Sequence, residues 1–179
     1  MRLGMTVLRV VVGGLFVGHG LQKLTGAFDG GGLEKTGEAF ESMGLTPGRT
    51  QATMAGAAEA GGGALLAAGF LTPLGATAVT GTMAMAIHKV HGENGPWVTK
   101  NGFEYNLVLM AAVFAITAQG PGSLSLDWFR DADEGSLFSA LAQLAVGVGG
   151  TAAVLKATEA GLIPELGGRT PVAAAAGAA

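Results

Sequence analysis

The sequence has no cysteine and few charged residues, and each shortage excludes a class of function. Without cysteine, the chain forms no disulfide, has no thiol nucleophile and cannot ligate an iron–sulfur cluster. Any redox role therefore needs a bound cofactor or a partner protein. Charged residues make up 13% of the 179 residues, against about 25% in an average soluble domain. So thin a polar shell argues against an ordinary soluble protein.

Basic surface and catalytic signature motifs are also missing. The formal net charge is -3, which supplies no basic surface for nucleic acid. The sequence has no glycine-rich phosphate loop, no HExxH and no GxSxG motif. We therefore expect no nucleic-acid binding and no soluble nucleotide or hydrolase chemistry.

Long apolar runs dominate what remains. A helix of about 20 apolar residues crosses the hydrocarbon core of a bilayer. Five such runs occur, at residues 3–24, 50–71, 73–90, 103–119 and 135–155. Small-residue pairs such as Gly14-x-x-x-Gly18 and Gly56-x-x-x-Ala60 favour close helix packing. The runs predict an all-α transmembrane bundle of four helices with a fifth helix, multi-pass in the lipid bilayer of the cell membrane.

The connection between the first two runs has a helical pattern of its own. Leu33, Phe40 and Met43 are spaced for one helix face, with charged residues between them. This pattern predicts a short amphipathic helix that lies on the membrane surface or caps the bundle.

Alternating span direction brings most ionisable residues of the spans to one half of the bilayer. The first span ends in this half, the second leaves it, the third returns and the fourth departs again. The residues concerned are His19, Lys23, Glu59, His88, His91 and Glu104. Random placement would not often bring all six residues to the same half of the bilayer. We therefore interpret them as a polar cluster.

Arg9 lies deeper than this cluster. It precedes Lys23 by 14 residues, or about 21 Å of helix. A charge at that depth persists only with a partner. Glu59 is the only acid within residues 50–71 and 73–90. We therefore predict a buried ion pair between Arg9 and Glu59.

The order and spacing of short motifs across residues 3–127 resemble the DoxX family of small membrane proteins. The motifs are Arg9 with Gly14-Leu15-Phe16, His19-Gly20-x-x-Lys23, Glu59-x-x-Gly62-Gly63 with Gly69 and Thr72, Asn101-Gly102-Phe103-Glu104-Tyr105, and Gly120-Pro121-Gly122-x-x-Ser125-Leu126-Asp127. The resemblance implies a four-helix membrane domain at residues 1–127. We expect an additional membrane helix at 128–157 and a disordered C-terminal tail at 158–179.

The resemblance also bears on function. Relatives are linked to sulfur-compound or thiol oxidation that feeds quinone, and to redox-stress assemblies. Arg9, His19, Lys23, Glu59 and Glu104 match polar motifs of the family. His88 matches loosely, and these six residues form our predicted cofactor-binding set.

We weigh three functions for this set. A redox-associated subunit would bind quinone or dock a soluble or membrane oxidoreductase, with His19, Lys23, Glu59 and Glu104 as hydrogen-bond donors and proton carriers. A small transporter or proton-coupled channel would use the same cluster. A purely structural subunit would use Arg9 and Glu59 to fix helix register. Whether the protein is itself an enzyme, and whether it forms a homo-oligomer, stays open.

Metal and haem sites are less favoured alternatives. His88-x-x-His91 is half of a metal site, which Glu93, Glu104 or His19 would have to complete. Two histidines at this spacing are common by chance. A bis-histidine haem would need His19 and His88 at similar depth. A di-iron site of the ferritin type is not expected, because no glutamate stands three residues before His19 or His88.

Overall fold

The computed structural model describes residues 3–166, which form an all-α fold without strands. Its α-helices are α1 (Leu3–Thr25), α2 (Gly32–Ser42), α3 (Gly48–Ala68), α4 (Thr72–Ala86), α5 (Glu104–Gln119) and α6 (Leu137–Glu159). A π-helical turn, Ile87–His91, continues α4. The five apolar runs and the amphipathic segment are thus confirmed as helices, with bounds within a few residues of those predicted.

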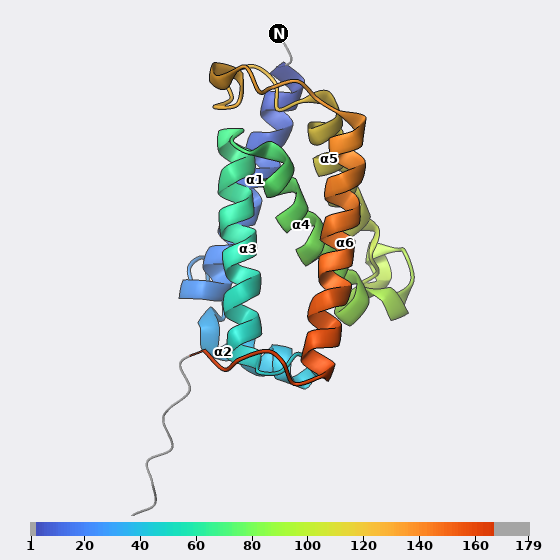
Figure 1. Ribbon diagram of the computed structural model, residues 1–179. Helices are drawn as coiled ribbons and strands as arrows, with labels where there is room; N and C mark the ends of the chain where they lie inside the picture. Colours follow the sequence, from blue (N-terminus) through green and yellow to red (C-terminus); the bar gives the residue numbers. More distant parts are fainter. Residues whose placement is uncertain (1–2, 167–179) are drawn as a thin grey trace, which may run out of the picture.

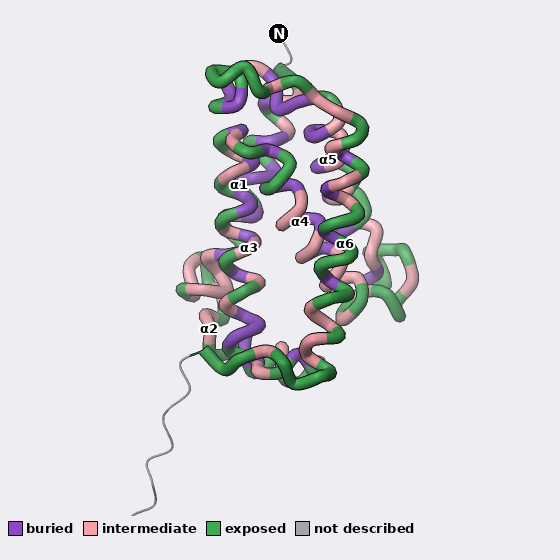
Figure 2. The backbone as a smooth tube through the Cα atoms, in the orientation of Figure 1, coloured by how far each residue is buried: buried purple, intermediate pink, exposed green. Residues whose placement is uncertain are grey.

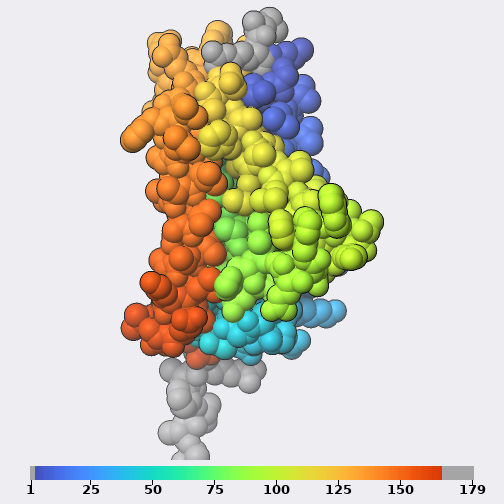
Figure 3. Space-filling view, turned by 90° about the vertical axis from the view of Figure 1, so that its right-hand side faces the viewer, coloured from blue at the N-terminus to red at the C-terminus, as the bar shows by residue number. Residues whose placement is uncertain are grey.

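Helices α1, α3, α4 and α5 contact one another in a ring, and α6 packs on its outside against α4 and α5 (Figure 1). Figure 3 shows α6 running beside α5. The short helix α2 packs on α1 and α3 at the end opposite the N-terminus. Among the described residues, α1 and α6 are long and apolar enough to cross a membrane, and α5 is a shorter apolar helix.

Glycines let α1 and α3 touch backbone to backbone. A Cβ atom at Gly13 would lie 2.5 Å from the Gly63 carbonyl oxygen, and one at Gly20 would lie 2.6 Å from that of Gly56. The predicted contact through Gly56 and Ala60 is therefore confirmed. The predicted Gly14-x-x-x-Gly18 contact is wrong, since a Cβ at either position would meet nothing within 4 Å. Those two glycines lie on another face of α1.

The bundle is closely packed in the half that contains the N-terminus. Its core includes Phe16 of α1, Leu66 of α3, Val79 of α4 and Val113 of α5, all buried. The outer faces of the helices are largely exposed (Figure 2). They carry large apolar side chains, among them Val7, Val11, Val108, Phe138 and Leu141.

Arg9 holds this end of the bundle together. The residue is 1% exposed, and its guanidinium donates to the carbonyl oxygens of Pro121 at 2.8 Å and Leu124 at 2.7 Å. It also donates to Leu66 at 3.4 Å and to Ala67. The last carbonyls of a helix lack intrahelical donors and carry partial negative charge, so they suit a cation. Arg9 thereby ties α1 to the end of α3 and to the loop after α5.

Asp127 completes this arrangement from the same loop. Its carboxylate accepts hydrogen bonds from the backbone nitrogens of Leu71 at 3.0 Å and Thr72 at 3.1 Å, and from the Thr72 hydroxyl at 2.8 Å. These donors stand at the start of α4. Asp127 therefore caps α4 from a position 55 residues away in the chain.

The C-terminal segment departs from the prediction of disorder as far as Leu166. Helix α6 extends to Glu159, and the chain then crosses to α3 (Figure 1). There the Thr50 hydroxyl donates to the Pro164 carbonyl at 2.9 Å and accepts from the Leu166 nitrogen at 2.8 Å. Polar groups at the start of α3 hold this stretch in place. Residues 167–179 lie outside the described residues.

Replacing Asp127 with alanine should lower the free energy of unfolding by about 2–4 kcal/mol, because three donors at the start of α4 lose a charged acceptor. Thermal or SDS-induced unfolding in mild detergent measures this change. Glu134→Ala is the matched control, since it removes an exposed acid from the same loop and should change stability by less than about 0.5 kcal/mol. Equal stability of both variants would contradict the assigned cap.

Candidate functional site

A cavity of about 610 Å³ occupies the half of the bundle that faces α2. The cavity lies where the C-terminal part of α4 diverges from α3 (Figure 1). Nearer the N-terminus, Gly62 and Gly75 keep these two helices in close contact. Beyond Ala78 they separate, and the space between them stays unfilled. All six α-helices contribute residues to the lining.

An ion pair lies at the polar end of this cavity. Lys23 Nζ of α1 is 2.6 Å from Glu59 Oε2 of α3. The Glu59 side chain is 7% exposed and that of Lys23 is 25% exposed. An ammonium group has three donor hydrogens. One donates to Glu59, so two remain for a ligand.

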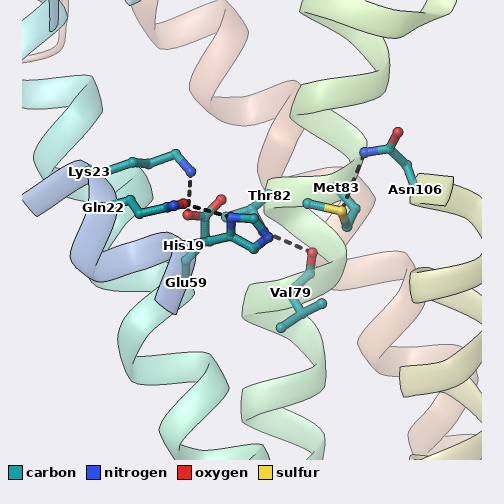
Figure 4. Close-up of polar contacts among 8 residues, drawn as sticks. All are labelled: His19, Gln22, Lys23, Glu59, Val79, Thr82, Met83 and Asn106. Atoms are coloured by element: carbon teal, nitrogen blue, oxygen red, sulfur yellow. Dashed lines mark hydrogen bonds and ion pairs between the residues drawn. The ribbon is translucent and has the colours of Figure 1, made fainter. Parts of the chain in front are cut away.

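His19 lies one turn before Lys23 on the same helix. Its Nδ1 lies 3.1 Å from Gln22 Oε1. Figure 4 shows the imidazole pointing from α1 towards α4, near Val79 and Thr82. The ring and the ion pair together form one polar patch on the cavity wall.

Asn106 of α5 lies across α4 from this patch. Its side-chain amide donates to the Met83 sulfur at 3.4 Å, and both residues line the cavity (Figure 4). Asn106 is 5% exposed. A thioether is a weak acceptor. The amide therefore gives up little when a stronger acceptor, such as a ligand carbonyl, approaches.

Most of the remaining wall is apolar. Met43, Met54 and Met85 line it, together with valines of α6. Methionine side chains are flexible and polarizable, so they adapt to ligands of irregular shape. A cavity with a small polar patch and a large adaptable apolar wall suits an amphipathic small molecule.

The cavity is blind. Its lining includes no residue of α1 before Phe16 and none of α3 after Glu59. Beyond these points lie the buried core around Leu66 and Val113 and the hydrogen bonds of Arg9. Within residues 3–166, the cavity lining therefore stops short of the N-terminal end of the bundle.

The structure gathers half of the six predicted site residues in this cavity. His19, Lys23 and Glu59 line it together. Arg9 lies at the other end of the bundle, and neither His88 nor Glu104 is part of the lining. His88 is exposed on the π-helical turn. The neighbouring His91 does line the cavity, and its Nδ1 lies 2.8 Å from the Asn101 carbonyl oxygen.

The predicted ion pair between Arg9 and Glu59 is wrong. Arg9 lies beside Ala67, which follows Glu59 by two turns, or about 12 Å of helix. Its guanidinium donates to four carbonyl oxygens instead of to the Glu59 carboxylate. Glu59 instead meets Lys23, because α1 and α3 run antiparallel and these residues lie at the same level.

The geometry gives little support to metal or haem binding by the histidines. Within residues 3–166, no group of three or more histidine, aspartate or glutamate side chains is placed to hold a metal ion. The two histidines that a haem would need are not brought together, since His19 faces the cavity and His88 is exposed.

Sequence analysis missed Asn106 and the wall formed by α6. Asn106 does carry a signal, because an amide within the apolar run 103–119 must find a partner or a ligand. The contribution of α6 has no such signal. Its lining residues are glycine, valine and threonine, and they resemble those of any packed membrane helix.

A double-mutant cycle distinguishes the observed ion pair from the predicted one. Lys23→Met and Glu59→Gln should each destabilise the protein, and the double variant should recover about 1–3 kcal/mol of coupling energy in detergent unfolding. The control cycle combines Arg9→Met with Glu59→Gln. Its effects should add within about 0.5 kcal/mol, because the two side chains share no partner. Coupling in the control cycle alone would overturn this assignment.

One of three comparisons with known proteins gave a match. The sequence model of a family described as DoxX matches residues 4–92, about half of the chain. These residues cover α1 to α4 and the π-helical turn, including Lys23 and Glu59. The searches of curated proteins and of solved structures found no match. The chain belongs to the DoxX family.

Proposed function

We propose that this protein spans the cell membrane several times and holds an isoprenoid quinone in its cavity for a redox partner. Membrane insertion is supported by the distribution of side chains. Large apolar residues such as Val108 and Phe138 are exposed on the outside, whereas Arg9, Gln51 and Asn106 are buried. A bilayer solvates the first set and penalises exposure of the second.

The observation that carries the quinone proposal is the blind cavity with one polar patch. A quinone combines a flat head group bearing two carbonyl acceptors with a long apolar chain. The free donors of Lys23 and the amide of Asn106 suit the carbonyl oxygens, and the methionine-lined wall suits the ring and the chain. The cavity volume falls within the range of small-molecule pockets.

The redox part of the proposal rests on composition. With no cysteine in the chain, thiol chemistry must come from outside. A partner oxidoreductase would deliver electrons to the bound quinone, and Glu59 and His19 would be the proton-carrying groups nearest its head. A transporter would need a continuing path, so the blind end favours binding over transport.

Membrane insertion predicts the behaviour of the native protein on extraction. Alkaline carbonate and high salt should leave it in the membrane pellet, and mild detergent should release it, because spanning helices are freed only when lipid is replaced. Immunoblotting of the fractions measures this, with a peripheral membrane protein as control. Release by carbonate alone would exclude the multi-pass arrangement.

Quinone binding is tested with decylubiquinone and a decyl naphthoquinone on protein purified in mild detergent. Titration calorimetry should show saturable binding of at least one of them. Lys23→Met combined with Glu59→Gln should weaken it about 10- to 100-fold, the loss expected for a hydrogen bond from a charged donor. His88→Ala is the control and should bind normally, since His88 lies outside the lining. Absence of binding of both quinones, with solute or proton movement in liposomes, would favour the transporter instead.

A further inference from the structure

Helix α6 lies outside the part of the chain that matches the family, yet it forms one wall of the cavity. The match ends at residue 92, and α6 begins at Leu137. Its inward face brings Val146, Gly150 and Val154 to the cavity. This wall is therefore a contribution of the present chain that residues 4–92 do not contain.

Hydrogen bonds and close packing fix α6 to α4. The Thr80 hydroxyl donates to Gln143 Oε1 at 3.0 Å, and the Thr151 hydroxyl donates to the Gly81 carbonyl at 2.9 Å. Between them, a Cβ atom at Gly147 would lie 2.7 Å from a methyl of Thr80. The three contacts span two turns of α6, so its orientation on α4 is well determined.

The packing of α6 against α3 is much less extensive than its packing against α4. Helices α3 and α6 face each other across the cavity without packing along their lengths (Figure 1). They are joined at the α2 end, where Gln51 Nε2 donates to Thr158 Oγ1 at 2.7 Å and Thr50 holds the C-terminal segment. Above this junction, Met54, Ala55 and Ala58 of α3 line the cavity opposite α6. Met54 is 41% exposed and Val146 of α6, also in the lining, is 61% exposed, so the cavity opens to the surface between these two helices.

We propose that the apolar chain of the bound ligand passes out to the bilayer between α3 and α6, and that α6 selects for that chain. This inference rests on the proposed function, because it concerns the tail of the same ligand. The head group occupies the polar patch on the inner side of the cavity. The opening is bordered by small and apolar side chains, so an aliphatic or isoprenoid chain fits there and a polar solute does not.

Gly150 offers a direct test of this path. It lines the cavity, and a Cβ atom placed there would meet no heavy atom within 4 Å. The adjacent Gly149 is equally open but lies outside the lining. The Cβ atom of a leucine at either position therefore enters open space, and leucine is a better helix former than glycine. Only at Gly150 does the added side chain occupy the opening.

The experiment compares Gly150→Leu with Gly149→Leu by calorimetric titration of two probes in detergent. The probes are decylubiquinone and the same dimethoxy-methyl-benzoquinone head without a chain. Gly150→Leu should weaken binding of the decyl probe at least about tenfold (about 1.4 kcal/mol) and leave the chainless probe within about twofold. Gly149→Leu should leave both unchanged. Similar loss of both probes, or loss of neither, would overturn the inference.

A second measurement keeps the inference testable if Gly150→Leu fails to fold. A decyl benzoquinone with a diazirine at the chain end is photolysed on the unmodified protein, and labelled peptides are identified by mass spectrometry. Labels should fall on residues 54–58 of α3 or 146–154 of α6. Labels confined to α1 or α5 would overturn the path but leave quinone binding intact. Failure of the unmodified protein to bind any quinone would refute the proposed function itself, and with it this inference.

Discussion

The structure depends first on the burial of one guanidinium. Arg9 is charged, nearly unexposed and satisfied by carbonyl oxygens from α3 and from the loop after α5. An unpaired charge there would be very costly, so these segments are held where they can solvate it. This arrangement requires glycine at position 69. Gly69 ends α3 in a left-handed backbone conformation, and a Cβ atom there would lie 3.0 Å from Arg9 Cζ. With one end clamped, α3 and α4 can separate at the other end, and the cavity results.

Five of the six α-helices of the described residues could be predicted from the sequence because each is a long, mostly apolar run bounded by glycine, proline or charge, and α2 could be predicted from its amphipathic spacing. Helix contacts were harder to predict. Small residues occur on several faces of α1, and the sequence does not say which face meets α3, so Gly14 and Gly18 were chosen where Gly13 and Gly20 make the contact. The partner of Arg9 was missed for a related reason: backbone carbonyls carry no sequence signature.

The candidate site was predicted in part. Antiparallel alternation of the helices places His19, Lys23 and Glu59 at one level, and this follows from counting residues. The contribution of α4, α5 and α6 depends on helix rotation and on divergence of α4 from α3. Neither can be counted along the chain. The roles of Asn106 and Gly150 are therefore seen only in the structure. Asn106 supplies an amide donor and Gly150 leaves open space, and no motif indicates either.

The pairing of Lys23 with Glu59 also bears on the electric field across the membrane. A single charge at this site would experience a transmembrane voltage worth about 2.3 kcal/mol per 100 mV if moved across the whole field. Opposite charges 2.6 Å apart form a compact dipole with no net charge. An uncharged ligand that settles beside this dipole transfers no charge through the field. Binding of an uncharged ligand in the cavity would therefore not respond to the membrane potential, whereas transfer of protons or electrons to it would.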